Sequence, residues 1–138
     1  MTEEKCHDKY QAKFLKHFAN GLTRNIILWI ISKEKIHGYG IMKKLEEFFD
    51  FENINHYIKI TSSKVYPILR MMEEEGLIIG EWDINENNKR VKYYSITEKG
   101  LNILDKISFA LNFISKNPAW IAFYGDMGVE LNEKRDWN

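Results

Sequence analysis

The chain has 138 residues, of which 44% are apolar and 29% charged, so it is long enough and apolar enough to bury a core and is not of the disordered class. Its densest apolar run, residues 26–31, is much shorter than the roughly 18 residues of a membrane helix, so no membrane association is predicted. No apolar segment follows a basic one at the N-terminus, and the single cysteine, Cys6, forms no internal disulfide. These features predict a cytoplasmic protein.

The basic and acidic residues are equal in number, 20 of each, but they are segregated along the chain. Eight basic residues and one acid, Glu34, lie between Lys9 and Lys44, whereas acids gather at residues 46–52 and 73–75. Such segregation can place a positive potential on one face of a neutral molecule, which suits a nucleic-acid partner. The same pattern also fits ordinary solvated helix faces, so charge alone leaves both interpretations open.

Apolar spacing predicts several helices in the first part of the chain. They cover residues 5–20, a segment from 23 to the break at 35–38, residues 39–49 and residues 62–75. The first is expected to stop at Asn20-Gly21, because glycine tolerates a left-handed C-terminal position, and Thr23 is expected to cap the second. Gly76 ends the helix of residues 62–75 in the same way, and residues 51–61 are predicted to form a loop.

Beyond Gly76 the apolar period changes to about two, which predicts strands at 77–84 and 90–96 joined by a polar loop. A long helix then starts near residue 97 and ends before Pro118, since residue 117 is pushed out of the helical region. The predicted fold class is mainly α with a small β-hairpin, a winged helix-turn-helix. Its parts are an N-terminal helix (1–21), the winged helix-turn-helix (22–96) and a C-terminal dimerisation helix with a tail (97–138).

In this layout the helix at 62–75 is the recognition helix, which enters the major groove, and the hairpin contacts the backbone or the minor groove. Ser63, Tyr66 and Arg70 lie opposite the apolar face of this helix, with Lys64 beside them, and all can donate to phosphates or base edges. Pro67 on the same face either bends the helix or is tolerated near its start. The hairpin tip supplies phosphate-binding candidates, namely Asn87, Asn88, Lys89 and Arg90.

Four motifs in order resemble the PadR family of transcriptional regulators, over roughly residues 25–104. They are His37-Gly38-Tyr39, Val65-Tyr66-Pro67-Ile68-Leu69, a run from Met72 to Ile78, and a run from Lys92 to Gly100. The resemblance implies a dimeric, repressor-like protein whose DNA contacts come from the helix Ser62–Arg70 and the wing Asn88–Lys92, so Ser62 and Lys92 join the predicted set.

The chain departs from the family pattern in two places. Ser62-Ser63-Lys64-Val65 stands where the family usually has a glycine or serine and a threonine-leucine pair, which concerns base preference more than fold. The loop at 51–61 is long and lacks the usual glycine, which can change how the recognition helix is presented.

The last helix carries a heptad-like apolar seam that predicts a homodimer, with intramolecular packing as the alternative. The seam consists of Leu104, Ile107, Leu111 and Ile114. In the tail, the aromatic residues Trp120, Phe123 and Tyr124 either line a pocket for a small-molecule effector, as in ligand-sensing members of the family, or form core. Trp29 and Trp82 are expected to be buried.

We therefore predict a sequence-specific DNA-binding regulator, a repressor acting as a homodimer on double-stranded DNA. The alternative is a winged-helix protein-interaction module, which the neutral charge and the acids at 73–75 favour. Cys6, His7 and His17 match no standard zinc spacing, so neither a metal nor a cofactor is predicted. An enzyme is not predicted, because no nucleophile–base pairing or phosphate loop is present.

Overall fold

The computed structural model describes residues 2–50 and 59–131 of the chain. The chain forms two compact units, residues 1–101 and 102–138. The helices are α1 (Thr2–Lys33), α2 (Gly38–Phe48), α3 (Ser62–Glu74), α4 (Glu98–Lys116) and α5 (Pro118–Asp126). The strands are β1 (Ile36–His37), β2 (Ile78–Ile84) and β3 (Arg90–Ile96). The predicted fold class, mainly helical with a small antiparallel sheet, is confirmed, whereas the division at residues 21 and 96 stays a prediction.

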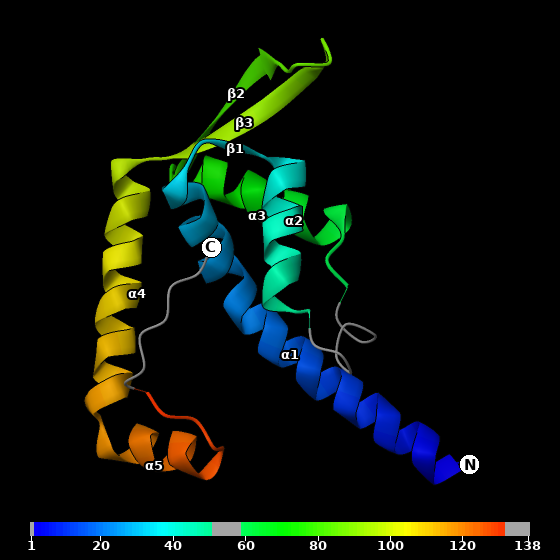
Figure 1. Ribbon diagram of the computed structural model, residues 1–138, viewed down its shortest axis with the longest axis vertical. Helices are drawn as coiled ribbons and strands as arrows, with labels where there is room; N and C mark the ends of the chain where they lie inside the picture. Colours follow the sequence, from blue (N-terminus) through cyan, green and yellow to red (C-terminus); the bar gives the residue numbers. More distant parts are fainter. Residues whose placement is uncertain (1, 51–58, 132–138) are drawn as a thin grey trace. The chain divides into compact units, whose positions relative to one another are not determined.

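The first unit has one apolar core, shared by three helices and the base of the sheet. α2 packs against α1, and α3 packs against both α2 and β2 (Figure 1). The fully buried side chains lie at helical spacing on their elements, and they are Ile27, Ile30, Ile31, Ile41, Leu45, Val65 and Leu69. Burying these faces stabilises the unit, at about 2 kcal/mol for each large aliphatic side chain, and leaves the opposite face of α3 free for another role.

The sheet has three antiparallel strands in the order β1-β3-β2. The hairpin of β2 and β3 pairs Ile78 with Ile96 at its base and Ile84 with Arg90 near its tip. The short strand β1 pairs Ile36 with Tyr94, so the segment expected to be only a break also contributes a strand. A strand of two residues is too short to show the alternation of apolar and polar residues by which a strand is predicted. Ile36 and His37 form a strand only because they pair with β3.

The predicted stop at Asn20-Gly21 is wrong, because α1 runs without interruption from Thr2 to Lys33. Thr23 caps nothing; its hydroxyl donates to the carbonyl of Ala19 at 2.7 Å, one turn back in the same helix. Ala19 and Thr23 are buried on the side of α1 that continues into the core. A glycine inside a helix costs only about 1 kcal/mol, which the packing of this face outweighs.

Replacing Gly21 with alanine is expected to stabilise the protein by about 1 kcal/mol, because alanine is the better helix former and a Cβ at Gly21 meets no atom within 4 Å. Urea unfolding at one protein concentration measures the change. Gly76→Ala is the matched control and should destabilise, since Gly76 has a φ of 75° that alanine adopts poorly. A loss of stability in Gly21→Ala would contradict the continuous helix.

Candidate nucleic-acid interface

One face of α3 is exposed, whereas the opposite face forms core. Val65, Leu69 and Met72 are buried, whereas Ser63, Tyr66, Pro67 and Arg70 are exposed, as the apolar spacing predicts. The helix continues through Pro67. Because proline has no N–H, the carbonyl of Ser63 lacks its usual partner one turn on, and it lies on the exposed side where solvent can donate to it.

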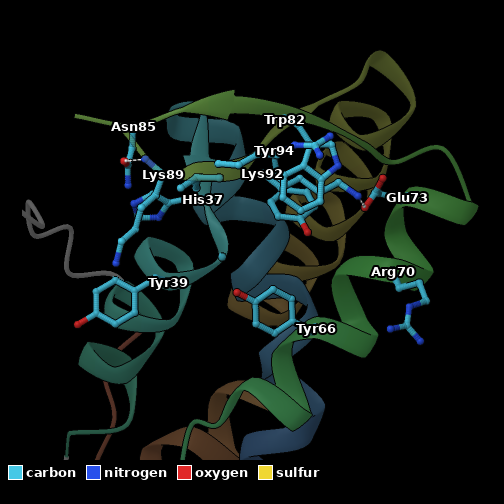
Figure 2. Close-up of a pocket in the computed structure, with 13 residues that line it drawn as sticks. His37, Tyr39, Tyr66, Arg70, Glu73, Trp82, Asn85, Lys89, Lys92 and Tyr94 are labelled. Carbon is cyan, nitrogen blue, oxygen red and sulfur yellow. Dashed lines mark hydrogen bonds and ion pairs between the residues drawn. The ribbon is translucent and has the colours of Figure 1, made fainter. Parts of the chain in front are cut away.

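α3 faces a groove of about 740 Å³, which the N-terminal end of α2 and the hairpin also line (Figure 2). Arg70 and Tyr66 come from α3, Tyr39 from α2, and Lys89 and Arg90 from the hairpin tip. Four cations and one acid line it, the cations being Arg70, Lys89, Arg90 and Lys92 and the acid Glu73. The structure therefore gathers positive charge on one surface of a chain whose formal net charge is zero.

The His37-Gly38-Tyr39 motif positions α3 against α2. The imidazole Nδ1 of His37 accepts from the backbone N–H of Gly40 at 2.8 Å and caps α2. The tyrosine ring of Tyr66 lies against Gly38, where an added Cβ would be 2.5 Å from the Tyr66 hydroxyl oxygen. Tyr66 keeps 42% of its surface exposed. Tyr66 thus packs against Gly38 and also lines the groove.

The hairpin tip is held in shape by Asn85. Its side-chain oxygen accepts from the backbone N–H groups of Asn87 (3.0 Å) and Lys89 (2.9 Å), and Asn88 takes the left-handed conformation with φ of 59° that asparagine tolerates. These contacts order the backbone of the loop and leave the side chains of Asn88, Lys89 and Arg90 exposed. The tip therefore offers ordered cationic groups.

The expected burial of Trp82 is wrong, since 58% of this residue is exposed. It lies on the hairpin opposite Lys92, with the guanidinium carbon of Arg90 4.8 Å from its ring centroid. Trp29, in contrast, is half-buried and meets Phe48 edge-on. Both faces of a hairpin that projects beyond the core meet solvent, so an aromatic residue there is not a core residue. Trp82 and Tyr39 are groove residues that sequence reasoning missed.

The remaining predicted contacts differ in placement. Ser62 is exposed at the N-terminal end of α3, where backbone N–H groups and the helix dipole favour a phosphate. Lys64 is also exposed, but it lines a second pocket of about 470 Å³ with Asn20 and Arg24 of α1, away from the groove beside Tyr66.

Lys92 lines the groove, with its ammonium 2.8 Å from Glu73 Oε1. That hydrogen bond raises the pKa of Lys92 above its ordinary value, against the opposing effect of partial burial.

In the second unit, α4 displays the predicted seam and α5 the predicted aromatic group. Leu104, Ile107 and Ile114 are half-buried, whereas Leu111 is 59% exposed and Phe109 77% exposed. The tail is not irregular: Asn117 caps α5 by accepting from the N–H of Ala119 at 3.0 Å, with Pro118 in the first turn. The rings of Trp120, Phe123 and Tyr124 pack on one another with centroids 5.6–6.1 Å apart.

Two further observations concern other kinds of site. Among residues 2–50 and 59–131, no group of three or more His, Cys, Asp or Glu side chains could hold a metal ion. His17 is exposed, while the side chains of Cys6 and His7 lie outside what the structure describes. None of the helices in the described part of the chain is long and apolar enough to cross a membrane.

A three-helix core with a β-hairpin beside an exposed helix face defines a winged helix-turn-helix protein. The sequence matches the "Transcriptional regulator PadR-like family" over residues 27–106, more than half of the chain, and the protein belongs to this family. The predicted resemblance is thereby confirmed. A comparison with the curated proteins found no match.

Solved structures of similar fold come from several bacteria. A PadR-like transcriptional regulator from Bacillus cereus is 26% identical, with a TM-score of 0.61 over 86% of this chain and 99% of that one. A PadR family regulator from Eggerthella lenta is 24% identical (TM-score 0.59, covering 90% and 94%). One from Clostridium difficile is also 24% identical (TM-score 0.59, covering 78% and 99%). The last two comparisons support the fold alone.

Proposed function

We propose that this protein is a sequence-specific DNA-binding repressor that acts as a homodimer. The observation that carries the proposal is the positively charged groove between the exposed face of α3 and the ordered hairpin tip. α3 enters the major groove of DNA and reads base edges through Tyr66 and Arg70, while Ser62 and Ser63 meet a phosphate at its N-terminal end. Lys64, on the flank of α3, contacts the neighbouring backbone.

The wing contributes Asn88, Lys89 and Arg90 to the phosphate backbone or the minor groove. Exchanging both cations of the tip (Lys89→Ala with Arg90→Ala) is expected to lower the slope of log K against log salt by about 1.8, since each lost phosphate contact removes about 0.9. Fluorescence anisotropy with labelled duplex DNA at four salt concentrations measures the slope. Lys106→Ala with Lys116→Ala removes the same charge from two exposed residues of α4 that do not line the groove, and should leave the slope unchanged. An unchanged slope in the tip variant would contradict the assignment.

Homodimerisation uses the seam of Leu104, Ile107, Leu111 and Ile114. Support comes from the apolar side chains that α4 leaves exposed, because a monomer rarely leaves such a set uncovered. They are Leu101, Phe109, Leu111 and Phe113, and of the seam itself Leu111 is exposed while the other three residues are half-buried. Two-fold symmetry then presents two copies of α3 to half-sites about 34 Å apart, or a multiple of that spacing. Sedimentation equilibrium on the full chain tests whether the protein is a dimer.

The aromatic group Trp120, Phe123 and Tyr124 is proposed to contribute to an effector site. Titration of the protein with aromatic ligands, followed by Trp fluorescence, tests this proposal.

The direct test of the whole proposal is selection of bound duplexes from a random pool, followed by titration of the selected DNA and of a scrambled duplex. The expected result is a two-fold symmetric site bound more tightly than the scrambled DNA. Equal affinity for both duplexes would contradict sequence-specific binding, and no binding at low salt would favour the alternative of a protein-interaction module. That alternative rests on Glu74 and Glu75, which are exposed at the end of α3.

A further inference from the structure

An ion pair links the recognition helix to the wing. The ammonium of Lys92 on β3 lies 2.8 Å from Oε1 of Glu73 on α3, and the two side chains are only 28% and 29% exposed (Figure 2). The same ammonium lies 5.6 Å from the ring centroid of Tyr94 and 5.9 Å from that of Trp82. Lys92 is therefore directed into the angle between helix and hairpin, whereas Lys89 and Arg90 are exposed at the tip.

Strand β2 has a glycine, Gly80, at the point where Lys92 and Glu73 meet. A Cβ at Gly80 on β2 would overlap Cε of Lys92 and lie 3.1 Å from Oε2 of Glu73. Gly80 thus leaves the space through which the lysine reaches the helix. Any larger residue there would have to displace the pair.

We propose that Glu73 and Lys92 form a clamp that sets the position of the wing relative to the recognition helix, so that both meet one DNA duplex. Lys92 is then a positioning residue and not a phosphate contact. The pair also neutralises Glu73, the acid in the groove, which would otherwise repel DNA. Beyond β1 the hairpin is a two-stranded ribbon, which is only marginally stable by itself. Lys92 lies in this part, opposite Trp82, so its ion pair with α3 can restrict the motion of the ribbon. This inference rests on the proposed DNA binding.

The first measurement needs no DNA. Glu73→Gln, Lys92→Met and the double variant are unfolded in urea at one protein concentration. The effects of the two substitutions are expected to be non-additive by about two- to fivefold in the unfolding equilibrium constant, as for a partly exposed ion pair. Glu74→Gln combined with Lys92→Met is the control and should be additive, because Glu74 is exposed on the next position of α3. Additivity in the Glu73 cycle would overturn the clamp.

The second measurement is DNA affinity against salt. Lys92→Met should weaken specific binding about three- to tenfold with the salt slope unchanged, whereas Arg90→Met should lower the slope by about 0.9. Glu73→Gln should weaken binding as well, although removal of a negative charge alone would strengthen it. The exchanged pair Glu73→Lys with Lys92→Glu should recover most of the affinity.

A fall in slope in Lys92→Met, or tighter binding by Glu73→Gln, would overturn the positioning role. If the natural protein binds no DNA while the unfolding cycle still shows coupling, the proposed function fails and the positioning role with it. The contact between helix and wing then survives as a structural feature only. The two measurements thus separate failure of the clamp from failure of the proposed function.

Discussion

Replacing Arg70 with alanine is expected to weaken binding to the selected DNA by about 10- to 100-fold, the effect of losing one bidentate contact to a base at roughly 1–3 kcal/mol. Arg70 is exposed on α3 and lines the groove, and its guanidinium makes no ion pair or hydrogen bond with the described part of the chain. It is therefore available to DNA. Titration of the selected and the scrambled duplex by fluorescence anisotropy measures the change.

Two controls separate the possible roles of Arg70. Arg70→Lys keeps the charge but loses the planar fork, so it should retain affinity for scrambled DNA and lose preference for the selected site. Arg24→Ala removes an exposed arginine of α1 that lies outside the groove and should change binding less than twofold. Equal losses on both duplexes in Arg70→Ala would show that Arg70 contacts phosphate and does not read bases.

Replacing Gly100 with alanine is expected to destabilise the protein by about 3 kcal/mol, at the upper end of overpacking effects. A Cβ at Gly100 would overlap the backbone carbonyl oxygen of Leu77 and lie 2.7 Å from Cγ1 of Ile96. A carbonyl of the main chain cannot rotate away as a side chain can, and Thr97 also donates to that oxygen at 3.0 Å. The start of α4 would have to move off the base of the hairpin.

Urea unfolding measures this effect, with protein concentration held constant because an oligomer gains apparent stability from association. Gly125→Ala is the matched control: it adds the same methyl group to a helix, where nothing lies within 4 Å, and should not destabilise. A cost below about 0.5 kcal/mol in Gly100→Ala, the range of ordinary surface substitutions, would contradict the close contact between Gly100 and Leu77.

The three-helix core and the hairpin were predictable because their apolar residues repeat at the period of the element they form. α2, α3, β2 and β3 begin and end within about two residues of their predicted limits, the ordinary uncertainty of such boundaries. The site was predictable in part for the same reason, since the face of α3 opposite Val65 and Leu69 has to be exposed. Lys64 and Trp82 were placed less well, because their surroundings come from α1 and from the projection of the hairpin.

By itself the sequence determined the family, the helix α3 and the hairpin, since these depend on local periodicity, on Gly76 as a helix end and on motifs of fixed spacing. Only the tertiary structure decided that α1 continues through Gly21, that residues 36–37 pair with β3, and that Lys92 turns toward Glu73. In the last two cases the outcome depends on a contact between segments far apart in the chain, and at Gly21 the packing of the buried side of α1 outweighs a local helix preference of about 1 kcal/mol. The residues that neighbour each position in the sequence do not show which distant segment it will contact, so the local sequence pattern did not predict these features.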